Sequence, residues 1–300
     1  MSATAGLSRQ YVKLCDIRDF EDPELLAAIR CILPERDPLA HIERKVWEFA
    51  MLALFMEEVG RLSEDTEALS VGAGDERILF WLANRIGRMV ATDVYGQGAF
   101  VAGEAHPSML DDPRPHAPFP YREDHLEVMW MDGRELAFDD GTFDVVFTLS
   151  SIEHFGTHAD IARSARELGR VLKPGGHAVV VTEYLVRLHP LDTGLGETAV
   201  RALSLNRTLR EARPWRRHKL SEAFTARELD SVIVRPSGLR LMQPPELSVS
   251  ARSWENLTLV SHDGQVTTRG GSLYPMILVK ASHSVFTSVC LVLEKPPGTR

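Results

Sequence analysis

The chain has 300 residues, of which 44% are hydrophobic and 25% are charged, and its formal net charge at neutral pH is −8. This composition is ordinary for a globular protein with a large core, arranged as one big domain or two small ones. The negative charge argues against nonspecific nucleic-acid binding, which requires a basic surface.

The cysteines and the amino-terminal residues favour a cytoplasmic location. Cys15, Cys31 and Cys290 are far apart and lack CxxC spacing, so they suit a reducing environment and offer no metal site. The amino-terminal residues lack the apolar stretch of a signal peptide, and the most apolar stretch, 46–56, is too short to cross a bilayer. We therefore expect a cytoplasmic protein with no membrane span and no metal.

Two helices are predicted before the first strand. Asp22 and Pro23 supply an N-cap and a proline at the first helical position, and apolar residues then recur on one face. Asp37 and Pro38 repeat this pattern before a second apolar series. Helices at roughly 22–33 and 38–61 would form an N-terminal extension over residues 1–64 that flanks or covers the sheet.

From residue 68 short apolar runs alternate with helical segments. Strands are predicted at 68–71, 88–92, 126–131, 143–149 and 177–182, with helices at 78–84 and 160–172. Residues 173–176, Lys-Pro-Gly-Gly, would end the second of these helices. A helix at 225–234 and strands at 239–242 and 285–293 complete the pattern. The alternation predicts an α/β domain over residues 65–300 with a mostly parallel sheet and helices on both faces.

Two long segments interrupt this pattern, at about 95–124 and 188–220. The first is rich in Gly, Pro and His, and the second contains a basic run from Arg207 to Lys219. Long loops in a compact domain are more often functional than accidental. The basic run could hold a phosphate or carboxylate, although a solvated helix face is the more common explanation.

Polar or glycine residues follow four of the predicted strands, and the carboxyl ends of parallel strands are where ligands bind in such sheets. Gly72 and Gly74 permit a sharp turn and a close approach of the backbone to a ligand, but a glycine pair alone also occurs in simple tight turns. Arg77 stands where the dinucleotide fingerprint has its third glycine, which counts against NAD or FAD.

Two aspartates follow later strands. Asp93 lies 21 residues after Gly72, near the spacing at which an acidic residue meets a ribose diol. Asp132 could accept a hydrogen bond from an exocyclic amine while the N–H of Gly133 donates to a ring nitrogen, which would identify an adenine. A capping role for Asp93 and a turn role for Asp132 remain the alternatives.

Three stretches together resemble the class I S-adenosylmethionine-dependent methyltransferases of the type 11 group. They run from Asp132 to Val146, from Ser150 to His154 and from Glu167 to Gly176, and the resemblance extends over about residues 68–184. It implies a Rossmann-like, doubly wound sheet with an antiparallel strand near the C-terminus, and S-adenosyl-L-methionine as cofactor.

The resemblance also implies residue roles. Gly72 and Gly74 would contact the methionine part of the cofactor, Asp93 its ribose, and Asp132 with Gly133 its adenine. Ser150 or Ser151 would line the cofactor near the sulfonium. The chain departs from the group at Ser70, in place of a usual acidic residue, and at Glu76, in place of a third glycine. Glu76 could instead accept hydrogen bonds from the ammonium group of the methionine part.

A second, fainter resemblance concerns the helix with His41, Arg44, Lys45, Trp47 and Glu48, which is similar to methyltransferases of bacterial glycan assembly. It implies a sugar-type acceptor. Trp47 could also stack on a substrate, as could Trp81, but a core position is the expected role of both tryptophans.

An oxygen acceptor has to lose a proton, so a general base is expected near the methyl group. His154, after the fourth strand of the sheet, is the preferred candidate because histidine titrates near neutral pH. A helix-start residue packed against Glu153 is its structural alternative. Glu183, Tyr184 and His189 are weaker candidates.

The sequence thus predicts methyl transfer to a hydroxyl of a small molecule or glycan, with an anionic acceptor if the basic run contacts it. That run and the N-terminal helices would then wall the acceptor pocket. A non-catalytic subunit that binds the cofactor for a partner enzyme is one alternative, and an NAD-dependent oxidoreductase is another. The sequence does not identify the acceptor or the oligomeric state.

Overall fold

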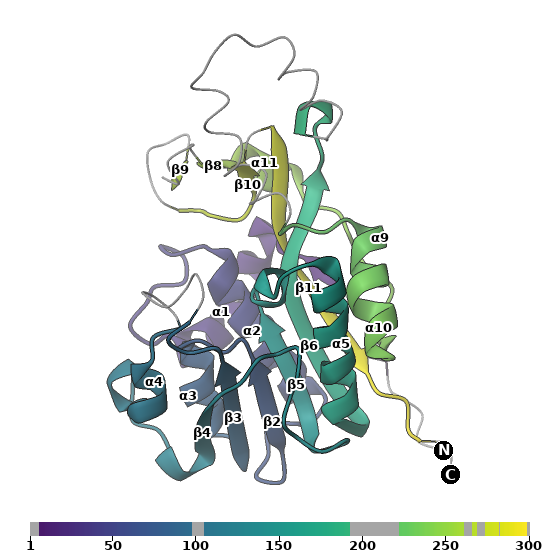
Figure 1. The fold of residues 1–300 in the computed structure, drawn as a ribbon. Coiled ribbons are helices and arrows are strands. Elements are labelled where there is room, and N and C mark those ends of the chain that lie inside the picture. Colours follow the sequence, from purple (N-terminus) through teal and green to yellow (C-terminus); the bar gives the residue numbers. More distant parts are fainter. Residues whose placement is uncertain are drawn as a thin grey trace.

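One sheet runs through the molecule and carries helices on both faces (Figure 1). The structure is a computed structural model, and it describes residues 6–97, 105–192, 222–260, 266–268, 274–281 and 283–298. The strand order is β4-β3-β2-β5-β6-β11-β10-β8-β9, and β1 and β7 also pair with β11. The chain direction changes only in the second half of this order, so a parallel part and a mixed part can be described separately.

The parallel part is formed by five neighbouring strands: β4 (Leu126–Trp130), β3 (Arg88–Asp93), β2 (Glu67–Val71), β5 (Phe143–Leu149) and β6 (Leu172–Arg187). β2 lies in the middle, where Ser70 pairs with Ala91 of β3 on one side and with Phe147 of β5 on the other. Their carboxyl ends therefore share one edge of the sheet. This confirms the predicted doubly wound α/β fold with a mostly parallel sheet.

The mixed part begins at β11 (Ser284–Glu294), which pairs antiparallel with β6 from Val285 to Glu294. It also includes the short strands β1 (Lys13–Leu14), β7 (Arg240–Leu241), β8 (Thr258–Val260), β9 (Val266–Thr268) and β10 (Val279–Ala281). The predicted antiparallel strand near the C-terminus is confirmed. In Figure 1 the upper ends of β6 and β11 rise beyond the carboxyl ends of β2, β3 and β5, and β8, β10 and α11 (Ala251–Glu255) lie there.

The helices form two layers. α5 (His158–Val171), α9 (Ala226–Glu228) and α10 (Arg235–Ser237) lie in front of the sheet in Figure 1, and α9 and α10 are joined by a π-helical turn, η6 (Leu229–Val234). The opposite face carries α1 (Pro23–Ile32), α2 (Arg44–Glu58) and α3 (Arg77–Ala83). Short helical turns complete the described chain: η1 (Ile17–Glu21), α4 (Ser108–Asp111), η2 (Arg114–His116), η3 (Glu123–His125), η4 (Ile152–His154) and η5 (Pro190–Asp192).

Local sequence explains several helix starts. Asp22 accepts a hydrogen bond from the N–H of Glu24, with Pro23 as the first helical residue of α1, as predicted. Thr157 and Asp160 form a capping box at the start of α5, since each side chain accepts a bond from the other residue's backbone.

Two predicted boundaries are wrong. The second N-terminal helix was expected from residue 38, but α2 begins only at Arg44, because the Asp37 side chain accepts from the N–H of Leu39 in a separate turn. The strand predicted at 177–182 is instead the sixteen-residue β6, which includes residues 173–176, and a register shift against β5 lets Lys-Pro-Gly-Gly remain in the strand. Pairing with the long β11 explains its length, and no local pattern shows that pairing.

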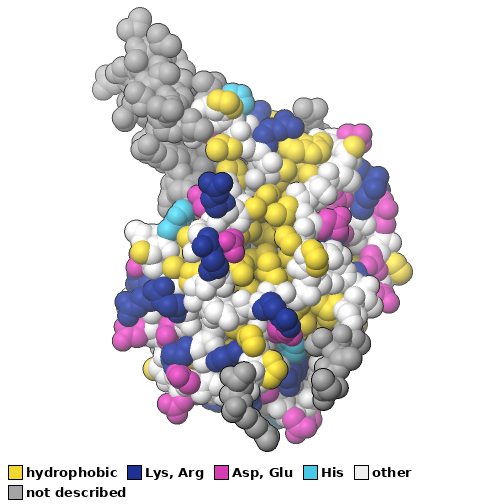
Figure 2. Space-filling model, turned by 90° about the vertical axis from the view of Figure 1, so that its right-hand side faces the viewer, with side chains coloured by type: hydrophobic (Ala, Val, Ile, Leu, Met, Phe, Trp, Pro, Cys, Tyr) yellow, Lys and Arg dark blue, Asp and Glu magenta, His cyan; other side chains and the backbone are white. Residues whose placement is uncertain are grey.

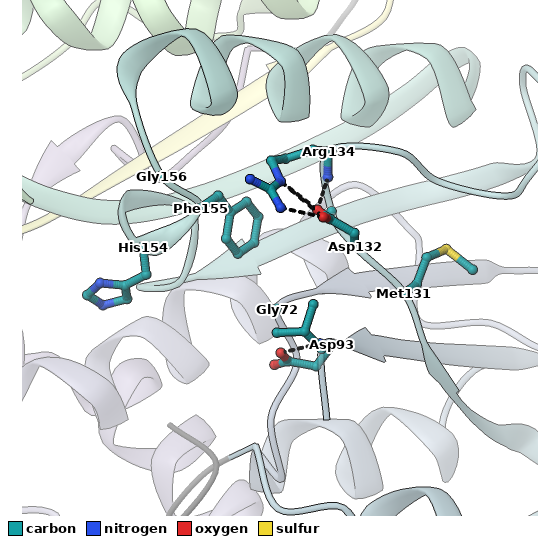
Figure 3. Close-up of a pocket in the computed structure, with 10 residues that line it drawn as sticks. Gly72, Asp93, Met131, Asp132, Arg134, His154, Phe155 and Gly156 are labelled. Atoms are coloured by element: carbon teal, nitrogen blue, oxygen red, sulfur yellow. Dashed lines mark hydrogen bonds and ion pairs between the residues drawn. The ribbon is translucent and has the colours of Figure 1, made fainter. Parts of the chain in front are cut away.

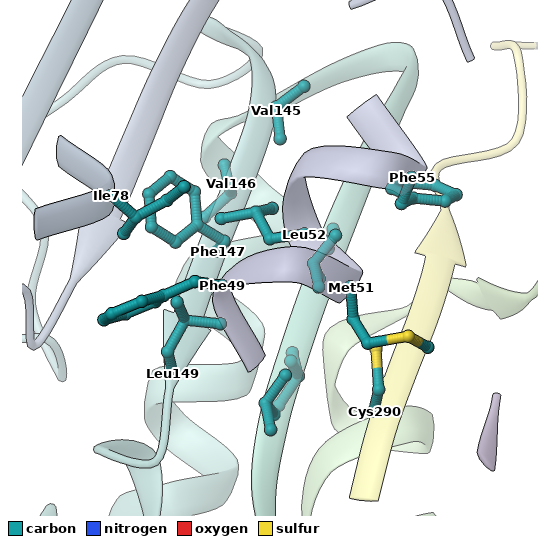
Figure 4. Packing of buried hydrophobic residues seen from close by; sticks show 14 of the residues in the cluster. Phe49, Met51, Leu52, Phe55, Ile78, Val145, Val146, Phe147, Leu149 and Cys290 are labelled. Carbon is teal, nitrogen blue, oxygen red and sulfur yellow. The ribbon is translucent and has the colours of Figure 1, made fainter. Parts of the chain in front are cut away.

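Helix α2 is buried on almost every side, as expected of a helix that packs against both a sheet and another helix. Figure 4 shows Phe49, Met51, Leu52 and Phe55 of α2 among side chains of α3, β5 and β11. The Trp47 side chain is fully buried, and its Nε1 donates to Asp19 Oδ2 over 2.8 Å. The N-terminal helical flank is therefore part of the main core and closes one side of the sheet.

Figure 2 shows the face that lies on the right of Figure 1. Hydrophobic side chains gather in its middle, and basic and acidic side chains are interspersed around them. The described residues of this face form no continuous basic band.

Candidate functional site

The loop after β2 brings its backbone close to two neighbouring strand ends. The N–H groups of Gly72 and Ala73 donate to the carbonyl of Thr92 over 2.8 and 3.0 Å, and Ser151 Oγ donates to the carbonyl of Gly72 over 2.7 Å. Gly72 has a φ of 72°, and a Cβ at this position would lie 2.6 Å from the Cβ of Ser151. Both the left-handed conformation and the lack of space therefore require glycine here.

Asp93 ends β3, and the backbone holds its carboxylate in one orientation. Oδ2 accepts from the N–H of Gly74 over 2.8 Å, and Oδ1 accepts from the N–H of Val94 over 2.7 Å. Burial raises the pKa of Asp93, and these two donors act in the opposite direction. Because each carboxylate oxygen has two acceptor positions, one on each oxygen remains for hydroxyl donors such as a ribose diol.

Asp132 and Gly133 follow β4 at the same edge. Asp132 accepts from the backbone N–H of Arg134 over 2.9 Å and from its Nη2 over 2.6 Å, and these bonds lower the pKa of the Asp132 carboxyl. A Cβ on Gly133 would lie 2.7 Å from Val71 and 2.8 Å from the ring of Phe155. The turn is therefore packed so tightly that only glycine can occupy position 133.

These strand ends surround one cavity of about 230 Å³. Figure 3 shows the Phe155 ring between Asp132 and Arg134 on one side and Gly72 on the other, with the Asp93 carboxylate next to Gly72. The cavity is lined by Gly72, Asp93, Val94, Met131, Asp132, Gly133, Arg134, His154, Phe155 and Gly156.

Five of the residues predicted from sequence thus meet in one place: Gly72, Asp93, Asp132, Gly133 and His154. Gly74 and Ser151 do not line the cavity but are hydrogen-bonded to residues that do: the N–H of Gly74 donates to Asp93, and the hydroxyl of Ser151 donates to the carbonyl of Gly72. The apolar lining residues were not predicted from the sequence, although Val94, Met131 and Phe155 each directly follow or precede a predicted residue. These lining residues could have been predicted from their position, because each is adjacent in the sequence to a predicted polar residue at the end of a strand.

His154 ends η4 and points away from Asp132 in Figure 3. Its Nδ1 lies 3.3 Å from Glu222 Oε1, and its side chain is 23% exposed while that of Glu222 is 9% exposed. With a proton on Nδ1 facing this carboxylate, Nε2 is the unprotonated ring nitrogen, which is the tautomer that a general base requires. Glu222 was not predicted, because 68 positions separate it from His154 in the sequence.

Glu153 is only 4% exposed. Its Oε2 accepts from Thr182 Oγ1 over 2.8 Å, whereas its Oε1 has no hydrogen-bond partner among the described residues. Burial raises the pKa of Glu153 to about 7, and the neighbouring Glu183 adds to this while His154 opposes it.

The first turns of α2 are bonded to the carboxyl edge of the sheet through charged groups. Arg44 forms an ion pair with Glu183, Lys45 donates to Glu76, and Glu48 accepts from Ser150 Oγ over 2.7 Å. Ser150 has a φ of 51°, the only positive φ of a non-glycine residue in the described chain. Ser150 and Glu76 therefore face α2 and do not line the cavity.

The weaker candidates lie farther along the chain. Glu183 and Tyr184 are within β6 and not after it, and Glu183 is engaged by Arg44. The backbone N–H of His189 donates to Ser284 Oγ over 3.0 Å. Trp81 is buried beneath the Arg85 guanidinium, 3.9 Å from the ring centre, so it has the core role expected of it.

The basic run Arg207–Lys219 lies outside the described residues. Within the described ranges, no group of three or more His, Cys, Asp or Glu side chains is arranged to hold a metal ion. Among the helices of the same ranges, none combines the length and apolar character needed to cross a membrane.

The similarity to known proteins agrees with this geometry. Residues 69–180 match a protein family described as a methyltransferase domain. A chloroplastic protein of rice, assigned as a tocopherol O-methyltransferase, is 24% identical over 176 residues, which are 56% of this chain and 46% of that protein. The match thus spans about half of the rice protein's length.

Two solved structures share the fold. One is a protein of Bacillus halodurans C-125 assigned as a methyltransferase, with 16% identity, a TM-score of 0.50, and coverage of 82% of this chain and 98% of that one. The other is a protein of Galdieria sulphuraria assigned as a sarcosine dimethylglycine methyltransferase, with 12% identity, a TM-score of 0.50, and coverage of 83% and 85%.

Proposed function

Because residues 69–180 belong to the type 11 group of class I S-adenosylmethionine-dependent methyltransferases, we propose that this protein methylates a hydroxyl of a small molecule or glycan with His154 as general base. The cofactor of the group is S-adenosyl-L-methionine. The observation that carries the proposal is the cavity at the carboxyl edge, where Asp93, Asp132 and Gly133 lie beside His154.

The cavity suits an adenosyl cofactor. Asp93 presents two oriented carboxylate oxygens for the ribose diol, and Asp132 with Gly133 provides an acceptor and a donor for the adenine. Gly72 and Gly133 leave room where any side chain would collide with neighbouring atoms. The ring of Phe155 provides an apolar surface between them. In this assignment Glu76, Gly74, Ser150 and Ser151 are on the side of the methionine part.

The cofactor supplies a methyl group on a sulfonium, which is reactive toward a nucleophile approaching in line. The task of the chain is then to align the acceptor, exclude water and accept its proton. Glu222 would hold His154 in the tautomer whose Nε2 can take that proton. The Arg44–Glu183 and Lys45–Glu76 ion pairs support a wall for the acceptor that is built by α2.

The test begins with the cofactor and then varies the acceptor. Calorimetry with S-adenosylhomocysteine and with NAD identifies the cofactor class. Transfer of a labelled methyl group to phenols, sugars and amines then identifies the acceptor class, and phenols of the tocopherol type come first because of the rice relative. Binding without transfer to any acceptor would instead favour the non-catalytic subunit, and binding of NAD alone would favour an oxidoreductase.

The base is tested separately. His154→Ala should lower kcat by on the order of 10²–10⁴ and leave cofactor affinity almost unchanged. Glu222→Gln should lower kcat less, because the histidine remains. Parallel losses of rate and cofactor affinity in His154→Ala would show a structural role, and a rate within a few-fold of wild type would exclude His154 from the reaction.

The charge of the acceptor remains a prediction from the run at Arg207–Lys219. Replacing Arg213, Arg216 and Arg217 together should raise the KM of an anionic acceptor strongly, while S-adenosylhomocysteine binds as before. An unchanged KM would remove the basic run from the acceptor site.

A further inference from the structure

Arg134 forms a bidentate ion pair with Asp132 at one side of the cavity (Figure 3). Asp132 Oδ1 accepts from the backbone N–H of Arg134 and from its Nε, each over 2.9 Å. Oδ2 accepts from Nη2 over 2.6 Å and from Nε over 3.1 Å. A carboxylate offers about four acceptor positions. Arg134 therefore takes all of them, and in this arrangement Asp132 has none left for a ligand.

Asp93, at the neighbouring strand end, differs in this respect. Each of its oxygens accepts one backbone hydrogen bond, from Gly74 or from Val94, and keeps a second acceptor position. The proposed function places the adenine of the cofactor at Asp132, and the present inference rests on it. With the adenine there, its 6-amino group can donate to Asp132 only after a bond from the Arg134 guanidinium has broken.

A second carboxylate lies within reach of the same guanidinium. Arg134 Nη1 is 3.9 Å from Asp160 Oδ1, in the first turn of α5. Asp160 Oδ2 accepts from the backbone N–H and the hydroxyl of Thr157, whereas Oδ1 accepts no hydrogen bond in the part of the chain that the structure describes. The side chains of Arg134 and Asp160 are 41% and 35% exposed, so the guanidinium has room to turn from Asp132 to Asp160.

The exposure of the pair sets the size of the effect. The side chain of Asp132 is 32% exposed, and water weakens an ion pair at such a position. The bidentate geometry makes this pair stronger than an ordinary surface pair. Breaking it therefore has a measurable cost, and the hydrogen bond from the adenine and the new contact with Asp160 offset part of that cost.

We propose that Arg134 competes with the adenine of the cofactor for Asp132, and that its guanidinium turns to Asp160 when the adenine binds. Arg134 thus lowers the affinity for a ligand that carries the 6-amino group, and Asp160 limits this loss. A ligand without that group leaves the pair between Arg134 and Asp132 intact.

Two ligands separate this competition from a structural role of Arg134. One is S-adenosylhomocysteine, and the other is the same compound with purine in place of adenine, which lacks the 6-amino group. By calorimetry at pH 7.5, Arg134→Met should bind S-adenosylhomocysteine about 3- to 10-fold more tightly than wild type, the size expected for one partly exposed bidentate pair. The purine analogue should bind within about twofold of wild type.

Further variants test the parts of the exchange. Arg134→Lys keeps the charge without the bidentate geometry and should give a smaller gain of the same sign. Asp160→Asn should weaken S-adenosylhomocysteine about 2- to 5-fold, but should have no effect when combined with Arg134→Met, because Asp160 acts only through Arg134. Arg163→Met is the matched control. Arg163 pairs with Glu135 at the surface, so its loss should leave the binding of both ligands unchanged.

Weaker binding of S-adenosylhomocysteine by Arg134→Met would overturn the inference, and so would equal changes for both ligands. Either result leaves the proposed function in place. A loss in Asp160→Asn that persists in the double variant would overturn the exchange between the two carboxylates. Wild-type protein that binds neither ligand would contradict the proposed function itself, and this inference with it.

Discussion

The carboxyl group of Glu153 is almost completely removed from water in the folded protein. The free-energy cost of ionising it there can be measured. One oxygen accepts from Thr182, and the other has no partner in the part of the chain that the structure describes. Burial raises the pKa of Glu153 from its ordinary value of 4.5 to about 7. The charged groups around it are His154, which favours the ionised form, and Glu183, which disfavours it. Glu153→Gln keeps the shape and the bond from Thr182 but removes the charge.

Whether stability rises or falls with pH depends on which state, folded or unfolded, binds the Glu153 proton more tightly. The folded state holds it more tightly, so the stability linked to protonation is fully present below about pH 4.5 and is lost as the pH rises through 7. One pKa unit corresponds to about 1.4 kcal/mol, so at pH 8 the ionised carboxylate should cost on the order of 3 kcal/mol. Glu153→Gln should therefore be more stable than wild type by about that amount at pH 8, and by less than about 1 kcal/mol at pH 5.

Urea unfolding of both proteins at several pH values between 5 and 8 measures this difference directly. Glu255→Gln, at an exposed position, is the control and should not change the pH dependence of stability. A difference between Glu153→Gln and wild type that is the same at pH 5 and pH 8 would refute the reasoning. So would a glutamine variant that is less stable at pH 8.

Two other predictions concern the cofactor site and the helix layer. Asp93→Ala should weaken the binding of S-adenosylhomocysteine by ~2–4 kcal/mol, because the complex loses up to two charge-assisted hydrogen bonds. Calorimetry measures this loss, and the melting temperature of the protein should change little. Unchanged affinity in the folded variant would exclude the ribose role, and Asp111→Ala at an exposed position is its control. Gly169→Ala should lower the free energy of unfolding by about 2 kcal/mol or more, because its Cβ would lie 1.9 Å from the carbonyl oxygen of Ser237 where α5 meets α10. A denaturant midpoint equal to that of the wild type would contradict this, because it would show that α5 and α10 can move apart with little loss of free energy.

The parallel half of the sheet was predictable from the sequence, because its information is local. β2, β3 and β5 are short apolar runs bounded by polar or glycine residues, and the predicted boundaries agree with the structure within a residue. The rule that parallel strands end at one edge then placed Asp93 and Asp132 together, without any knowledge of their distance. The family resemblance covered this same region.

Contacts between distant parts of the chain required the tertiary structure. The length of β6 depends on its partner β11, which lies more than 90 residues later in the chain. Glu222 reaches His154, and Lys45 reaches Glu76 and Leu149, from segments whose own sequences show no binding motif. The periodicity of a sequence records which face of an element is buried, but it does not record which element covers that face. The sequence alone therefore determined the edge of the sheet at which the candidate site lies, and only the packing of α2, β11 and the segment at Glu222 against that edge decided which charges surround it.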